Sequence, residues 1–98
     1  MRKSRNPASE IPLPGLQPFI AEFSASRKEE LVQLKGYLDA SDFEAMRKLA
    51  HTWKGFAVPY GYGILEYLAI ELELAAEDRN REVCQSLVKE VEIYLSSK

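Results

Sequence analysis

The sequence predicts an all-α fold, an antiparallel up-down four-helix bundle preceded by an extended N-terminal arm. Three observations lead to this prediction. Apolar residues recur at three-and-four spacing from residue 19 almost to the end of the chain. Four of the five prolines precede residue 19, and no segment shows the apolar and polar alternation of a strand. With 98 residues, 46% of them hydrophobic, the chain can form one domain with one modest core.

The first 18 residues are expected to form a flexible, Pro-rich arm. Helix-breaking residues are spread along them, at Pro7, Pro12, Pro14, Gly15 and Pro18. Proline has no backbone amide proton to donate, and its ring clashes with the preceding turn of a helix, so a regular helix is excluded there. The sequence therefore predicts two parts, an arm over residues 1–18 and a helical bundle domain over residues 19–98.

Two helices are predicted before Pro59. Residues 26–29 match a capping box, in which a serine and a glutamate three residues later satisfy the first amides of a helix. The first helix therefore either runs on from residue 19 or begins afresh within this box. A second capping box that starts at Ser41 predicts the next helix, which should continue to about Ala57. Pro59 and the glycines after it end that helix and form the connection.

The third helix is predicted over residues 63–77, and Asn80 is the predicted N-cap of a fourth. The third helix has one core stripe and a second apolar line that is interrupted by glutamates. The residues of the second line are Tyr67, Ile70 and Leu74. They either pack against a neighbouring helix or form an exposed patch for a partner.

The composition excludes several classes of function. Thirteen basic and fifteen acidic residues give the chain a net charge of −2. The chain therefore lacks the positive field that nucleic-acid binding needs. One cysteine and one histidine provide neither a disulfide nor an ordinary zinc site, and Cys84 lies on an apolar stripe where a buried, unreactive thiol is expected. The sequence has no signal-peptide pattern and no apolar run of about 18 residues, so we predict a cytoplasmic protein that does not enter a membrane.

The only histidine, His51, is the most informative residue of the chain. At about 100° per residue, the apolar residues between 43 and 57 fall in one arc of the second helix, and His51 points away from it. Arg47, Lys48 and Lys54 lie three or four residues from it. Three nearby cations disfavour protonation of the imidazole, but they stabilise an imidazole that carries a phosphoryl group of about two negative charges. Gly55, expected within the helix, adds no bulk beside the ring and would let another protein approach.

These residues resemble the signature of the histidine-containing phosphotransfer (HPt) domain family, over roughly residues 19–95. In that family the phosphorylated histidine is followed by Lys at the third position, Gly at the fourth and a further Gly near the tenth, with a Leu-Glu pair about twenty-one residues on. The matching residues here are His51, Lys54, Gly55, Gly61 and Leu72-Glu73. Phe56 departs from the small residue that is usual in the family, and Trp53 from the usual Leu, Met or Ile.

The resemblance implies a phosphorelay intermediate of two-component signalling. His51 would accept a phosphoryl group from the phospho-aspartate of a response-regulator receiver domain and pass it to the aspartate of another. Lys54 would neutralise phosphoryl oxygens. The further candidates for contact with the receiver or the phosphoryl group are Gly55, Arg47, Lys48, Phe56 and Gly61.

The resemblance also implies that the receiver brings the Mg²⁺, so no cofactor or metal of the chain's own is expected. Gly61 and Gly63 lack the spacing of a phosphate-binding loop, so the chain should have no nucleotide site and no kinase activity. We expect a monomer, with a hybrid histidine kinase as a further candidate partner. The alternative is a non-catalytic four-helix module that binds receivers but relays no phosphoryl group.

Overall fold

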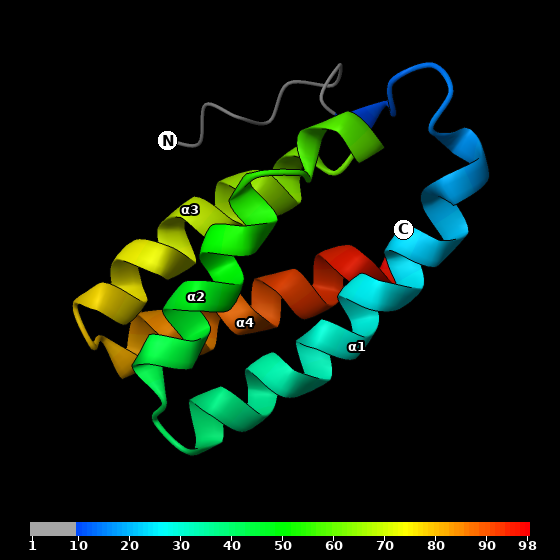
Figure 1. Ribbon diagram of the computed structural model, residues 1–98. Helices are drawn as coiled ribbons and strands as arrows, with labels where there is room; N and C mark the ends of the chain where they lie inside the picture. The colour runs from blue at the N-terminus through cyan, green and yellow to red at the C-terminus, as the bar shows by residue number, and fades with distance from the viewer. Residues whose placement is uncertain (1–9) are drawn as a thin grey trace.

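The computed structural model describes residues 10–98, and over this range the chain is helical without any strand (Figure 1). A 3-10 turn, η2 (Gln17–Phe19), leads into α1 (Ile20–Asp39). Helix α2 (Phe43–Lys54) follows, and the 3-10 turn η3 (Val58–Tyr60) connects it to α3 (Gly63–Glu77). Helix α4 (Arg81–Ser96) completes the predicted set of four.

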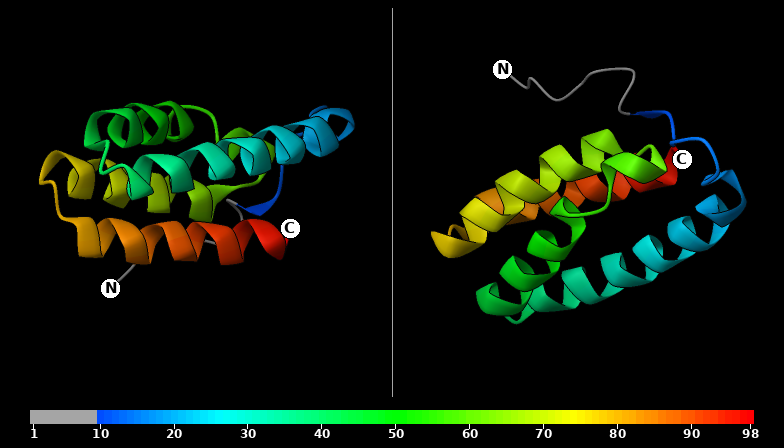
Figure 2. Two further views of the ribbon diagram at one scale, coloured as in Figure 1. Left: turned by 90° about the horizontal axis from the view of Figure 1, so that it is seen from below. Right: turned by 45° about the horizontal axis from the view of Figure 1, so that its top comes forward.

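The four helices surround one core as antiparallel neighbours. Helix α2 packs against α3, α3 against α4, and both α2 and α4 against α1 (Figures 1 and 2). This arrangement confirms the predicted up-down bundle. Among the described residues, no helix has the length and apolar character needed to cross a membrane. The largest completely buried side chains are Trp53, Leu34, Met46, Leu65, Leu68, Leu72, Leu95, Val91 and Cys84.

Helix α1 is continuous through the capping-box residues 26–29. Arg27 is buried there, and Phe23 and Leu31, four residues to either side, are buried on the same stripe. The Arg27 guanidinium lies 4.5 Å from the centre of the Phe23 ring and 4.6 Å from that of Phe56, and its Nε donates a hydrogen bond of 2.7 Å to Glu30. A fresh helix start at this point would interrupt the stripe, so the capping-box pattern is not used.

Helix α2 begins one residue later than its capping box predicts. Asp42 is the N-cap, and its carboxylate accepts a hydrogen bond of 3.2 Å from the amide of Ala45. Ser41 instead has a φ of 55° and belongs to the tight turn between α1 and α2. The predicted cap of α4 is confirmed, because Asn80 Oδ1 accepts a hydrogen bond of 3.2 Å from the amide of Val83.

Helix α2 ends at Lys54, before the predicted end at Ala57. Gly55 is the C-cap, with φ −81° and ψ −17°, so it lies at the end of the helix and not within it. The amides of Phe56 and Ala57 both bond to the Trp53 carbonyl, at 3.3 and 3.2 Å, which tightens the last turn into the connection. The periodicity of the sequence continued past Lys54 because Ala57 is still buried, although its backbone has left the helix.

The described part of the N-terminal arm lies against the end of the bundle, near the C-terminus (Figure 2). The Leu13 amide donates a hydrogen bond of 2.9 Å to the Pro59 carbonyl. Glu10 Oε2 accepts a bond of 2.8 Å from the amide of Ile64, and its Oε1 accepts bonds of 2.6 Å from the Tyr94 hydroxyl and 3.0 Å from Lys98 Nζ. Glu10 and Leu13 of the predicted arm therefore contact the bundle, and residues 1–9 lie outside the described residues. The division into an arm and a bundle domain stays a prediction.

Candidate functional site

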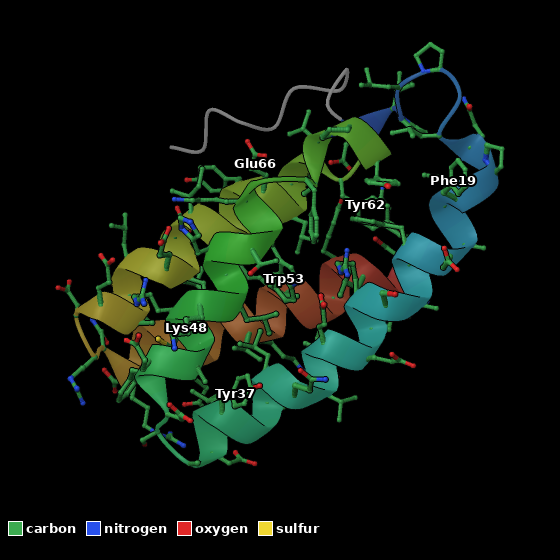
Figure 3. All side chains as sticks on the ribbon, viewed as in Figure 1. Phe19, Tyr37, Lys48, Trp53, Tyr62 and Glu66 are labelled. Atoms are coloured by element: carbon green, nitrogen blue, oxygen red, sulfur yellow. The ribbon has the colours of Figure 1, made fainter. Side chains whose placement is uncertain are left out.

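His51 lies in the last turn of α2, with 65% of its side chain exposed. The core-facing stripe of α2 includes Ala50 before His51 and Trp53 after it, and both are completely buried. His51 lies outside this stripe, as the helical spacing predicts. Figure 3 shows Trp53 pointing into the bundle between α2 and α1. Because α2 ends at Lys54, His51 lies in the last turn, whereas the predicted end at Ala57 would leave it nearer the middle of the helix.

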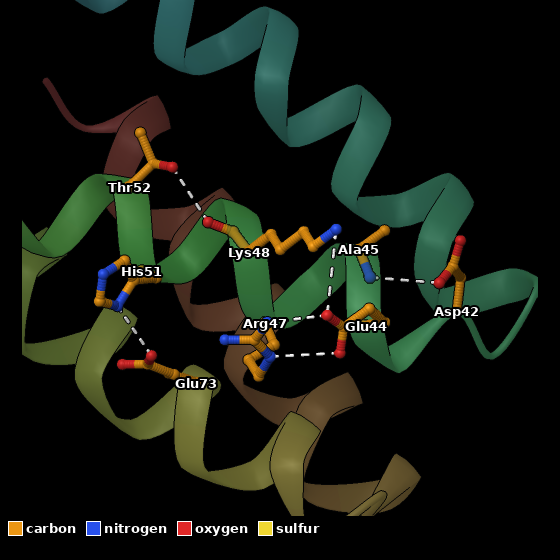
Figure 4. A network of polar contacts seen from close by, with 8 residues as sticks. All are labelled: Asp42, Glu44, Ala45, Arg47, Lys48, His51, Thr52 and Glu73. Atoms are coloured by element: carbon orange, nitrogen blue, oxygen red, sulfur yellow. Dashed lines mark hydrogen bonds and ion pairs between the residues drawn. The ribbon is translucent and has the colours of Figure 1, made fainter.

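Glu73 of α3 orients the imidazole ring. Its Oε2 lies 2.9 Å from His51 Nδ1, across the interface between α2 and α3 (Figure 4). The carboxylate is ionised, because the Lys54 ammonium, and after it the His51 ring, hold the pKa of Glu73 below its usual range despite the opposing effect of burial. An ionised carboxylate only accepts hydrogen bonds, so we assign the ring proton to Nδ1. Nε2 then carries the lone pair of the ring.

Lys54 binds the same carboxylate. Its Nζ lies 2.6 Å from Glu73 Oε1, and 34% of its side chain is exposed. Glu73 itself is only 9% exposed. Its two carboxylate oxygens bind two side chains from one turn of α2. The structure therefore brings His51 and Lys54 together through a third residue.

Arg47 and Lys48 stand on the same side of α2 as His51, but they pair with a different acid, Glu44. Arg47 Nη2 lies 2.7 Å and Lys48 Nζ 4.0 Å from Glu44 Oε2 (Figure 4). The pKa of Arg47 is raised chiefly by Glu44, with smaller contributions from Glu77 and Glu73. Their contact with a phosphoryl group stays a prediction.

Gly55 and Phe56 follow the site at the end of α2. A Cβ added to Gly55 would have only the Thr52 carbonyl oxygen nearby, at 3.6 Å, so this exposed glycine leaves open space beside the last turn. Phe56 is half-buried, and its ring meets that of Phe23 edge-on at 5.7 Å. The larger residue is accommodated by α1, while Gly55 keeps the surface beside His51 low.

Gly61 has a backbone reason for being glycine. Its φ is +84°, and a Cβ there would lie 2.7 Å from the Pro12 nitrogen. Other residue types rarely adopt this conformation, and the close approach of Pro12 leaves no room for a side chain. A direct role of Gly61 in docking stays a prediction.

Glu73 is the site residue to which sequence reasoning gave no role beyond membership of the Leu-Glu pair. One signal was present. Glu73 lies four residues after Ala69 and three before Ala76, and both alanines are buried. A glutamate on an apolar stripe requires a partner, but helical spacing alone does not show which partner, since His51 is 22 residues away.

The sequence also predicts an unreactive thiol at Cys84 and the absence of a metal site. Among residues 10–98, no group of three His, Cys, Asp or Glu side chains is arranged to hold a metal ion. Cys84 is buried, as expected, and burial raises the pKa of its thiol. The thiolate that would react is therefore disfavoured.

The comparison with protein families agrees with this geometry. The profile of the Hpt domain family matches residues 18–97, a range that covers all four helices. The comparisons with curated proteins and with solved structures found no significant match. Hpt domains are helical modules that carry phosphoryl groups between phosphorelay partners and are not kinases. With its four helices and its exposed histidine, the chain belongs to the Hpt domain family and acts in phosphotransfer within two-component phosphorelays.

Proposed function

We propose that His51 Nε2 accepts a phosphoryl group from the phospho-aspartate of one receiver domain and passes it to the aspartate of another. The observation that carries this proposal is the hydrogen bond of 2.9 Å between His51 Nδ1 and Glu73, on a side chain that is 65% exposed. It keeps the proton on one ring nitrogen and leaves the other as a nucleophile on the surface.

The transfer is an in-line displacement at phosphorus. The Nε2 lone pair forms the N–P bond while the P–O bond to the aspartate breaks, and the electron pair of that bond returns to the carboxylate. Nδ1 keeps its proton, so the phosphorylated ring is a cation. The ionised Glu73 offsets this charge from 2.9 Å, and it does so more strongly as the N–P bond forms. The same steps in reverse deliver the phosphoryl group to the next receiver.

Lys54 changes partner in this scheme. Its ammonium lies 2.6 Å from Glu73 before the reaction, and a change of side-chain rotamer carries it to the phosphoryl oxygens, whose negative charge is larger than that of one carboxylate oxygen. The receiver supplies the Mg²⁺, and Gly55 leaves space for the receiver's surface. The partners are receiver domains, with a hybrid histidine kinase as one source of them, and the chain works as a monomer.

The test is incubation of the purified protein with a panel of receiver domains phosphorylated at aspartate. Wild type should take up label in a form that acid removes and base does not, as an N–P bond on imidazole requires. His51→Gln should take up none, whereas Lys89→Gln, which removes an exposed cation of α4, should transfer like wild type. Label on His51→Gln would contradict the proposal, and receiver binding without any transfer would identify the non-catalytic module instead.

Lys54→Ala tests the role of the ammonium. We expect slower transfer or a shorter lifetime of phospho-His51, with receiver affinity nearly unchanged and the bundle still folded. Lys89→Ala is the matched control. Unchanged kinetics in Lys54→Ala would remove Lys54 from the mechanism.

A further inference from the structure

Two exposed apolar side chains stand next to each other on α3. Ile70 is 40% and Leu74 59% exposed, and they are four residues apart, which places them side by side on the helix surface. They belong to the line whose role the sequence left open, and their exposure excludes a core role for these two. Tyr67, the third residue of the line, is half-buried. We call Ile70 and Leu74 the outer α3 pair.

The outer α3 pair lies beside Glu73 on the surface of α3. Leu74 follows Glu73 in the sequence, and Ile70 precedes it by one turn, so both side chains lie on the solvent side of Glu73, about 60–100° around the helix from it. Glu73 in turn holds His51 and Lys54. A body that covers His51 from the solvent and extends across α3 therefore reaches this pair.

The two most exposed apolar residues on the other helices do not share this position. Val32 of α1 is 71% and Ile93 of α4 60% exposed, but each stands on a different helix from the site. Single apolar residues on a surface are ordinary and need no partner. The outer α3 pair differs because its two residues adjoin one another and flank Glu73, which binds His51.

The charges around the pair favour one kind of occupant. The α2 side of the site presents the cations Arg47, Lys48 and Lys54, while Glu66 and Glu77 lie within one turn of the pair along α3. A matching partner has acidic groups opposite α2 and an apolar patch opposite α3. A receiver domain has the first of these by necessity, because its phosphorylated aspartate and the carboxylates that hold its Mg²⁺ must face His51.

We propose that Ile70 and Leu74 form the apolar part of the receiver-docking surface and select which receiver is accepted, while His51, Glu73 and Lys54 carry out the transfer. This assignment rests on the proposed function and adds to it the residues that decide the partner. Contacts at the reacting atom alone give a transient complex little binding affinity. A small apolar cluster that is shielded from water supplies much of the affinity of such a complex.

The experiment compares Ile70→Glu and Leu74→Glu with two matched controls, Ile93→Glu and Val32→Glu. Each variant is mixed with the receiver that transfers fastest to wild type, and transfer is measured over a range of receiver concentrations. We expect the two α3 variants to lower kcat/KM about ten-fold or more through KM, with kcat at saturation nearly unchanged. Leu74→Met should restore transfer, and the controls should match wild type.

A small phosphoryl donor separates docking from chemistry. Phosphoramidate needs no docking surface, so it should label His51 equally in wild type and in the α3 variants. Equal kcat/KM in the α3 variants and the controls would overturn the docking assignment while leaving the proposed function intact, because wild type still transfers. A wild-type dimer that Leu74→Glu dissociates in sedimentation would also overturn it, since a second copy would then occupy the pair. If neither phosphoramidate nor any receiver labels wild-type His51, the proposed function itself fails.

Discussion

The indole nitrogen of Trp53 donates a hydrogen bond of 2.6 Å to Glu30, which joins α2, two residues after His51, to α1. Glu30 accepts a second bond, of 2.7 Å, from Arg27, whose side chain is 9% exposed. One carboxylate therefore satisfies two buried donors from two helices. The position of the last turn of α2 depends on this contact as well as on apolar packing.

Glu30→Ala should destabilise the bundle strongly. It leaves the Arg27 charge and the Trp53 N–H buried without their acceptor. We expect the free energy of unfolding to fall by about 2–3 kcal/mol. This is less than the roughly 3–5 kcal/mol expected when a fully buried pair is broken, because Glu30 is partly exposed. Urea unfolding followed by Trp53 fluorescence measures the loss. Glu29→Ala, at an exposed neighbouring position, is the control. Similar stabilities for the two variants would show that the contact contributes nothing.

Glu73 should make stability depend on acid pH. Lys54 and His51 lower its pKa from the usual value of 4.5, so the folded state favours the ionised form, and this contribution is complete at pH values above 4.5 and lost as the pH falls through the lowered pKa. Between about pH 6 and about pH 3, the free energy of unfolding should therefore fall further in wild type than in Glu73→Gln. Parallel urea titrations test this. Identical pH profiles would mean that the carboxylate gains nothing from its partners.

Gly55 should separate stability from docking. Its backbone angles are close to helical and a Cβ meets no tight contact, so Gly55→Ala should stabilise the protein by about 0.4–1 kcal/mol in thermal or urea unfolding. Gly55→Gln should weaken receiver association, because its side chain rises beside His51. Gly36 of α1 also has open space around a Cβ, so Gly36→Ala and Gly36→Gln are matched controls that should leave binding unchanged. Wild-type binding by Gly55→Gln would contradict the steric role.

Glu10 should act as a remote cap of α3. The N-cap of that helix, Tyr62, makes no side-chain capping bond, and Glu10 supplies the acceptor for the amide of Ile64. Burial, and then the bond to Glu10, raise the pKa of the Tyr94 hydroxyl, which therefore remains a donor.

Glu10→Ala removes the bonds to Ile64, Tyr94 and Lys98, and we expect a loss of about 1–3 kcal/mol in urea unfolding. Glu10→Gln, which keeps one acceptor oxygen, should lose less. Glu22→Ala is an exposed control in the first turn of α1. If Glu10→Ala unfolds like this control, residues 10–13 do not contribute to the stability of the bundle.

Features that depend on neighbours along the chain can be predicted from the amino-acid sequence. The bounds of α3 and the Asn80 cap of α4 follow from side chains three or four residues apart, and so does the exposure of His51. These features need only the helical period and local hydrogen bonds.

Contacts between distant residues were decided by the tertiary structure. Glu73 meets His51 across 22 residues, and Glu10 meets Tyr94 across 84; neither pairing leaves a periodic signal in the sequence. The same holds for the end of α2, where Ala57 continues the apolar pattern but lies in a turn that Pro59 and Leu13 hold. Local spacing tells which side of a helix a residue occupies, and only the packing of one helix on another tells which residue it meets there.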